Sequence, residues 1–231
     1  MSNDGIRNKF KYERMYQDLL RGQIRSKLEE IKTYYQALEY KFKNDKKLLS
    51  DRYEREIANK KISSEMLEGI NDYFSEENYT IEELFIKNFR YSIIVTIYST
   101  LETTLSDLCH YLRNTKKISL ALDDIKGEGI ERSKLYLQKV CVIDFPESSH
   151  EWQEIKKFNA IRNCIVHAEG DVSEVKNPQK LKNIIRSTTG ISLDSAIEKF
   201  IRIESSYILS IIKCIENFIN NIYEEAFKSK W

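Results

Sequence analysis

Proline and glycine are scarce in this chain. Of its 231 residues, two are proline and seven are glycine. These residues interrupt helices more strongly than any others, so their scarcity leaves room for long, unbroken helices. Apolar residues still make up 41% of the chain, which is enough to build a core. The composition therefore favours an all-α protein, with one large domain or a domain plus an appended helical element.

Other common signals are also missing. The four cysteines lie far apart and show no Cys-x-x-Cys spacing, so neither a disulfide framework nor a metal site is indicated. The 37 basic residues nearly balance the 36 acidic ones, so there is no global positive charge for nucleic acid. The N-terminus is too polar for a signal peptide, and the most apolar run, 91–98, is too short to span a bilayer. We expect a cytoplasmic protein without a cofactor, in which any anion site is local or formed by assembly.

Two long, charged helices are predicted between residues 10 and 75. Apolar residues recur mostly at steps of three and four over 12–42 and again over 53–74, as expected for two antiparallel helices with narrow apolar stripes. The basic run 41–47 fits either a solvated helix end or a phosphate contact. We predict an N-terminal charged helical extension over 1–78 and a helical bundle over 79–231.

A core helix is predicted from Thr80 onward. Thr80-Ile-Glu-Glu83 fits a capping box, in which the threonine hydroxyl accepts from a backbone amide and the glutamate reaches back. The helix should run to about Arg113, because apolar residues follow one another at steps of three and four. Glu102 lies one position off that stripe, as either a solvated glutamate or a functional one. A connector should occupy 114–132, and a short helix should follow over 133–142.

A second helix start is predicted at Ser148-Ser-His-Glu151, which also fits a capping box. This helix should end near Ala168, with Gly170 close to its C-cap. Residues 171–191 are polar and are expected to form a loop, with or without a small hairpin. The last helix should begin at about Leu193 and run nearly to the end of the chain.

Polar and charged side chains gather on the last turns of the helix that should end near Ala168. On a helical wheel Asn163 and His167 lie one turn apart on a polar ridge, whereas Arg162 falls within the apolar arc. An arginine there needs a partner or an interface, because an unpaired buried charge is costly. Histidine can exchange a proton near neutral pH, which acid–base catalysis requires. The spacing alone fits a salt bridge with a helix cap as well as a catalytic set.

The string Arg162-Asn163-Cys164-Ile165-Val166-His167 resembles the motif of HEPN domains, which is arginine, four to six residues, then histidine. A polar residue usually follows the arginine in that family, as Asn163 does here. The Leu-Glu-x-x-Leu setting of Glu102 and the Lys-Gly-x-Gly-Ile connector at 126–130 are similar too, so the resemblance covers about residues 80–227. It implies an HEPN-like bundle of four to five helices, here with an additional long N-terminal helical pair.

The resemblance also implies an activity. Many HEPN proteins are metal-independent endoribonucleases in which two protomers bring both motifs into one cleft. On that template His167 activates the 2′-hydroxyl or protonates the leaving oxygen, Arg162 stabilises the charge on the phosphate, and Asn163 holds the geometry. We expect a homodimeric toxin or anti-phage effector that cuts cellular RNA, with an antitoxin or defence-system protein as partner. Further substrate-binding side chains would be Lys156, Lys157 and Glu102.

Two alternatives remain open at this point. A non-catalytic HEPN module that binds RNA, nucleotide or a protein partner would account for long charged helices beyond the needs of the bundle. A structural helical dimer would use Arg162 in an interface salt bridge. The sequence also departs from those family toxins that an antitoxin enzyme inactivates on a tyrosine two residues after the histidine, because Glu169 stands at that position here.

Overall fold

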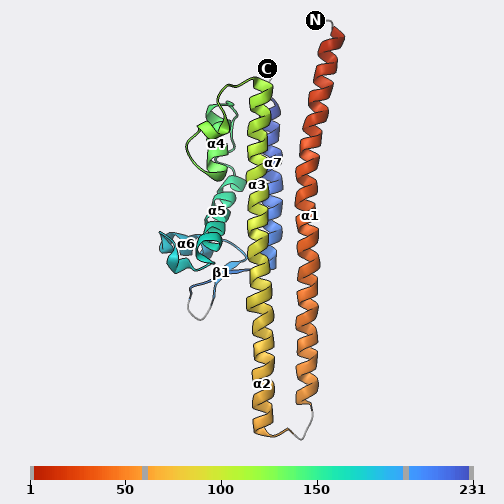
Figure 1. Ribbon diagram of the computed structural model, residues 1–231, viewed down its shortest axis with the longest axis vertical. Helices are drawn as coiled ribbons and strands as arrows, with labels where there is room; N and C mark the ends of the chain where they lie inside the picture. The colour runs from red at the N-terminus through yellow and green to blue at the C-terminus, as the bar shows by residue number, and fades with distance from the viewer. Residues whose placement is uncertain (1–2, 59–61, 195–197, 229–231) are drawn as a thin grey trace.

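An antiparallel pair of long helical rods dominates the fold (Figure 1). The computed structural model describes residues 3–58, with side chains from residue 15 onward, together with 62–194 and 198–228. The first rod is α1 (Asn3–Ile57). The second is one continuous helical run, made of α2 (Ser64–Tyr79), the π-helical turn η1 (Thr80–Ile86) and α3 (Lys87–Lys116). The all-α prediction is confirmed.

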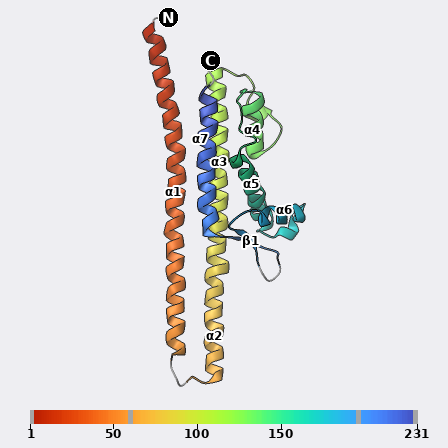
Figure 2. The same ribbon diagram turned by 180° about the vertical axis from the view of Figure 1, so that it is seen from behind.

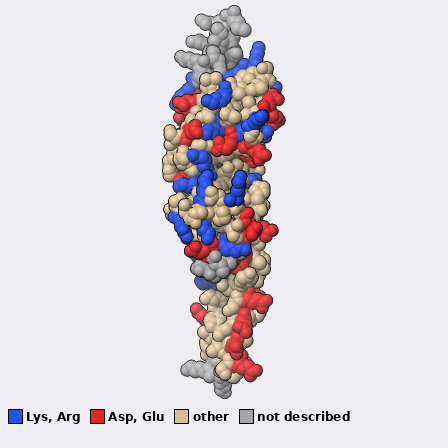
Figure 3. Space-filling view, turned by 90° about the vertical axis from the view of Figure 1, so that its left-hand side faces the viewer, with Lys and Arg blue, Asp and Glu red and all other residues tan. Residues whose placement is uncertain are grey.

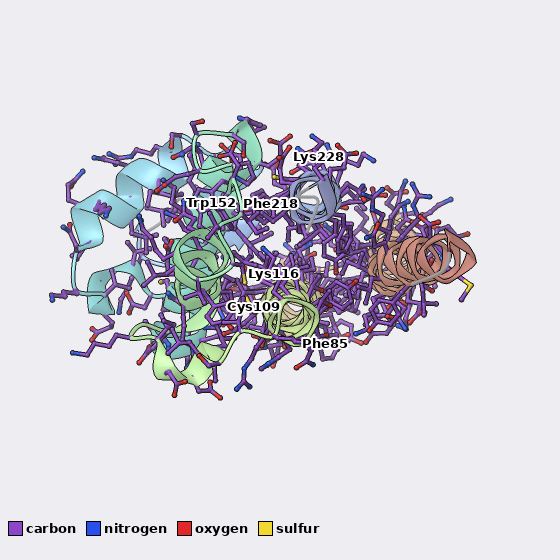
Figure 4. The ribbon with its side chains drawn as sticks, turned by 90° about the horizontal axis from the view of Figure 1, so that it is seen from above. Phe85, Cys109, Lys116, Trp152, Phe218 and Lys228 are labelled. Atoms are coloured by element: carbon purple, nitrogen blue, oxygen red, sulfur yellow. The ribbon has the colours of Figure 1, made fainter. Side chains whose placement is uncertain are left out.

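The shorter elements lie on the side of α3 away from α1, and α3 and α7 separate α1 from them (Figures 2 and 4). The two strands form an antiparallel hairpin in which Ile191 pairs with Ile203. None of the described helices combines the length and the hydropathy needed to cross a membrane. In chain order these shorter elements are η2 (Leu122–Asp124), α4 (Gly129–Lys139), α5 (His150–Ala168), η3 (Val172–Glu174), α6 (Pro178–Arg186), β1 (Ile191–Leu193) and β2 (Ile201–Ile203). Helix α7 (Ser205–Lys228) follows them and packs against α1, α3 and α5.

One apolar core joins α1, α3, α5 and α7. Trp152 of α5 stacks on Phe218 of α7, with ring centroids 5.4 Å apart (Figure 4). Each fully buried large apolar side chain stabilises the fold by about 1.5–3 kcal/mol. A smaller cluster lies toward the far end of the hairpin of α1 and α2. The main core includes Ile24, Leu28 and Tyr35 of α1 with Ile94, Ile97, Leu101 and Leu105 of α3; the smaller one is Leu49, Phe74, Ile81 and Ile86.

An ion pair holds α1 to the bundle. Arg90 of α3 donates from Nε and Nη2 to the carboxylate of Glu39, over 2.7 and 2.8 Å, and from Nη1 to the carbonyl of Ile203 over 2.7 Å. Such bidentate pairs are among the stronger side-chain hydrogen bonds. The helical run is continuous across residues 78 and 79, so the proposed division of the chain there stays a prediction about domain organisation.

α1 is longer than predicted. The basic run 41–47 lies inside this helix, and Tyr53 and Ile57 belong to α1 rather than to its antiparallel partner. The prediction was wrong because apolar spacing alone does not locate a turn, and no glycine or proline occurs between Gly22 and α2 to end the helix. α2 begins where Ser63 accepts a hydrogen bond from the backbone amide of Met66 over 3.2 Å.

The helical run passes through Thr80 without a break, so the first predicted capping box is wrong. Thr80 has helical dihedral angles (φ −59°, ψ −46°), and its backbone N–H already bonds the carbonyls of Glu76 and Glu77. A capping threonine instead needs an extended backbone ahead of the helix. The π-helical turn η1 adds residues to one turn and so shifts the helical phase. As a result Ile81 and Ile86 face the smaller cluster, while α3 faces the main core.

The predictions around α5 were more accurate. Helix α5 ends at Ala168 as predicted, and Glu169 adopts the left-handed conformation with φ 51°. Its N-cap is Ser149, one residue later than predicted, and the side chain of Ser149 accepts from the amide of Trp152 over 3.1 Å. The short helix expected after the connector is α4, which begins earlier, at Gly129.

The chain after α5 differs from prediction. The expected loop 171–191 contains α6, whose first residue is Pro178 and whose N-cap is Asn177. The last helix begins at Ser205 rather than at about Leu193, because Phe200 and β2 lie in or beside the hairpin. Ala196, which the prediction also placed in that helix, lies outside the described residues.

Candidate functional site

The end of α5 is fixed by a close backbone contact. Gly170 follows the helix with φ +81°, and its N–H donates to the carbonyl of Cys164 over 3.2 Å. A Cβ atom at Gly170 would collide with the hydroxyl of Tyr91. That hydroxyl is buried and donates to the carbonyl of Ile201 over 2.6 Å. Glycine is therefore required here, and the contact sets the position of His167 one turn earlier.

Arg162 stacks on an aromatic ring. The Cζ atom of Arg162 lies 4.6 Å from the ring centroid of Tyr98 on α3, and Nη1 donates to Oδ1 of Asn163 over 3.0 Å. Its Nε atom is buried without a hydrogen-bond partner, and no described carboxylate lies within ion-pairing distance of it. A guanidinium over a ring face is attracted to it, but its charge is not neutralised. Arg162 thus keeps a charge that can attract an anion.

Glu102 belongs to the same cluster through Tyr98. A Cβ atom at Gly129 would lie 3.3 Å from both the Oε1 atom of Glu102 and the hydroxyl of Tyr98. The start of α4 is therefore packed directly on these two side chains. Burial, and then the charge of Glu102, raise the pKa of Tyr98, whereas Arg162 lowers it. The structure thus brings together Arg162, Glu102 and the Lys-Gly-x-Gly-Ile connector, three features that lie far apart along the chain.

His167 lies on the other side of the same helix turn. It is exposed and, with Asn163, lines a groove of about 390 Å³ between α5 and α6. Val166 lies between the side of α5 that carries Arg162 and the side that carries His167, and it is 42% exposed. Within one chain, therefore, Arg162 and His167 face different neighbours. Asn163 connects them, because it bonds Arg162 and also lines the groove.

The predicted lysines differ in their surroundings. Lys156 is exposed, whereas Lys157 pairs with Glu154 over 2.8 Å and so has its charge compensated. Two lysines that sequence reasoning did not select, Lys176 and Lys180, line the groove beside His167. The Asn-Pro start of α6 could have revealed this helix in advance, but not that it packs on α5.

The charge distribution is uneven despite the near-zero net charge. Lysine and arginine side chains gather over the middle of the face that carries α5 and α6, whereas acidic side chains follow α2 toward the far end of the hairpin (Figure 3). Such a basic patch is the kind of local electrostatic footprint that attracts phosphate. In the described part of the chain, no three histidine, cysteine, aspartate or glutamate side chains are arranged to hold a metal ion.

No family model, curated protein or solved structure matches this chain. A functional conclusion must therefore come from the residues themselves. The geometry offers a guanidinium without a carboxylate partner, an amide that holds it, and an exposed imidazole one turn along the helix. Arg162 can bind a phosphate, and His167 can transfer a proton.

Proposed function

We propose that the protein is a metal-independent endoribonuclease of the HEPN type. The observation that carries the proposal is Arg162, whose guanidinium is held by Tyr98 and Asn163 but has no carboxylate partner among the described residues. A phosphodiester would supply the missing negative charge. His167 provides the proton-transfer group on the same stretch of α5.

The proposed reaction is transfer of the phosphate to the neighbouring ribose oxygen. The imidazole of His167 removes the proton of the 2′-hydroxyl, and the 2′-oxygen attacks phosphorus. The bond from phosphorus to the 5′-oxygen then breaks, and a protonated imidazole gives that oxygen a proton. The products are a 2′,3′-cyclic phosphate and a 5′-hydroxyl. Arg162 stabilises the charge that builds up on the phosphate oxygens.

The separation of Arg162 and His167 within one chain favours a homodimer. Arg162 and His167 lie on opposite flanks of the exposed Val166, so neither side of one chain presents both groups. A second copy that packs on Val166 about a two-fold axis would place each Arg162 beside the partner copy's histidine. Each Arg162 and the partner copy's histidine would then form one site, in which the same imidazole acts first as base and then, once protonated, as acid. Burying Val166 would also remove an apolar side chain from water.

In the cell, the protein would act as a cytoplasmic toxin or anti-phage effector that cuts cellular RNA. An antitoxin or another defence-system protein would restrain it, since an unrestrained ribonuclease harms its host. Glu102 would contribute through Tyr98 and the start of α4. Lys156 would add positive charge, whereas Lys157 contributes less because Glu154 already pairs with it.

The test is cleavage of tRNA and total RNA by the purified full chain in the presence of EDTA. Wild type should cut, and His167→Ala should reduce the rate by about 100-fold or more, the usual contribution of a general acid or base. His150→Ala is the matched control, because His150 is also exposed on α5 but lies at its first turn. This control should retain the wild-type rate.

Two results would reject the ribonuclease proposal. One is no cleavage by wild type, and the other is cleavage that His167→Ala leaves unchanged. Tight RNA binding without turnover would instead select the non-catalytic HEPN module, which binds RNA, nucleotide or a protein partner.

A further inference from the structure

We infer that the groove between α5 and α6 is a binding site for one unstacked RNA base, with the flanking phosphates held at its rim by Lys176 and Lys180. The inference rests on the proposed ribonuclease function and adds how the substrate is held next to the motif. It limits the substrate to RNA with unpaired nucleotides.

The groove has the size and lining of a small-molecule site. Its volume is about 390 Å³, within the range of about 300–1,000 Å³ that is usual for such sites. Ala160 of α5, Leu181 and Ile184 of α6, and Val175 ahead of α6 are among its lining residues. These side chains offer an apolar surface to a planar base. A base that is removed from water there gains the favourable free energy of apolar burial.

The rim of the groove carries the charge that a nucleotide requires. Lys176 and Lys180 are exposed, and neither forms an ion pair with another described residue. Glu174 is the one acid among the described residues of the lining. The two lysines outnumber it, so the rim favours an anion. An uncharged apolar ligand would leave both lysines without a role.

Asn163 joins the groove to the motif. Its Oδ1 atom accepts from Arg162, and Asn163 also lines the groove. His167 lines the groove one turn further along α5. A base seated between α5 and α6 would therefore place its own ribose and phosphate beside His167 and Asn163. In a duplex the base is stacked and paired and cannot enter, so the site selects single-stranded nucleotides.

Binding can be measured without cleavage. The probes are the nucleoside 3′,5′-bisphosphates of the four bases, which carry the flanking phosphates but no phosphodiester to break. Titration followed by methyl NMR should shift the signals of Ile184 and Ala160, and Lys180→Glu should weaken binding by about tenfold. Lys182→Glu is the matched control, since Lys182 lies on the same helix and its distance to Glu198 is a long 4.0 Å. It should change affinity less than twofold.

Two further probes separate the contributions of base and phosphate. Inorganic phosphate lacks the base, and the free nucleosides lack the phosphates. Phosphate that binds as tightly as the bisphosphates, or bisphosphate binding that Lys180→Glu leaves unchanged, would overturn the groove as a base site. Either result would leave the ribonuclease proposal standing if wild type still cuts RNA. Conversely, shifts at Ile184 without any RNA cleavage would support the groove and reject the ribonuclease.

Discussion

At the scale of single residues, the candidate site depends on what holds each charged group. Arg162 has no acid partner in the described chain, and its guanidinium lies over the ring of Tyr98. The hydroxyl of Tyr98 instead lies at the start of α4, beside Glu102. The ring and the hydroxyl of Tyr98 therefore have separate roles, which substitutions can distinguish.

Tyr98→Leu should lower kcat for RNA cleavage by about two- to thirtyfold, the range of a cation–π contact. Tyr98→Phe keeps the ring and should stay within about twofold of wild type. The measurement is steady-state cleavage of one oligonucleotide, with kcat and KM determined separately and thermal unfolding measured for each variant. Equal losses in the two variants would show that the ring does not position Arg162.

Gly170→Ala should destabilise the protein by about 2–4 kcal/mol, because it combines a left-handed backbone with a collision in the core. The residue has φ +81° and touches Tyr91. Gly69→Ala is the control, since Gly69 lies inside α2 with open space around it. Gly69→Ala should stabilise the protein by about 0.5–1 kcal/mol. Urea unfolding checks both, and a neutral Gly170→Ala would contradict the described end of α5.

At the scale of elements, local capping signals located some helix ends and failed at others. The end of α5 was predictable because the requirement for glycine at its C-cap is local. The start of α3 was not, because α2 continues into it and the Thr80 amide already has helical partners. The start of α7 was hidden by apolar residues, since Phe200 and Ile203 continue its spacing while lying beside or in a strand.

Ser149→Ala should destabilise the protein by about 1 kcal/mol, the usual contribution of an N-cap side chain. Ser149 accepts from the amide of Trp152, which also lies in the main core. Ser148→Ala is the neighbouring control and should be nearly neutral, because Ser148 is exposed and does not cap α5. If chemical denaturation showed the larger loss at Ser148, the capping box predicted from the sequence would be correct after all.

The candidate site was predictable only in part, because the sequence shows local spacing but not how separate elements pack. Arg162, Asn163 and His167 share one helix, so their relative directions followed from the helical period. The ring under Arg162 comes from α3, and Lys180 from a helix that was predicted to be a loop. Both depend on how separate elements pack, which periodicity does not specify.

At the scale of the whole molecule, burial controls the chemistry of the thiols. Burial raises the pKa of Cys141 and of Cys164 to about 11 each. Both side chains are 1% exposed. The folded protein therefore holds these protons more tightly than the unfolded chain, in which the ordinary value is 9.0. Their stabilising effect is complete below pH 9 and is lost as the pH rises toward 11.

Between pH 8 and pH 10 the free energy of unfolding should fall by about 1 kcal/mol for each of these thiols. Urea titrations at several pH values measure the decrease. Cys141→Ala should remove its share, so that the decrease over the same interval is about 1 kcal/mol smaller than in wild type. An unfolding free energy that stays constant up to pH 10 would mean that these thiols are not buried.

We propose that each active site combines Arg162 of one protomer with His167 of another. Arg162→Ala and His167→Ala chains should each be inactive alone. After partial unfolding and refolding together, they should recover about one quarter of the wild-type rate, because half of randomly paired dimers are mixed and each has one intact site of two. RNA cleavage in EDTA before and after mixing is the measurement. Recovery would establish the composite site, whereas continued inactivity of mixed dimers, alongside active refolded wild type, would contradict it.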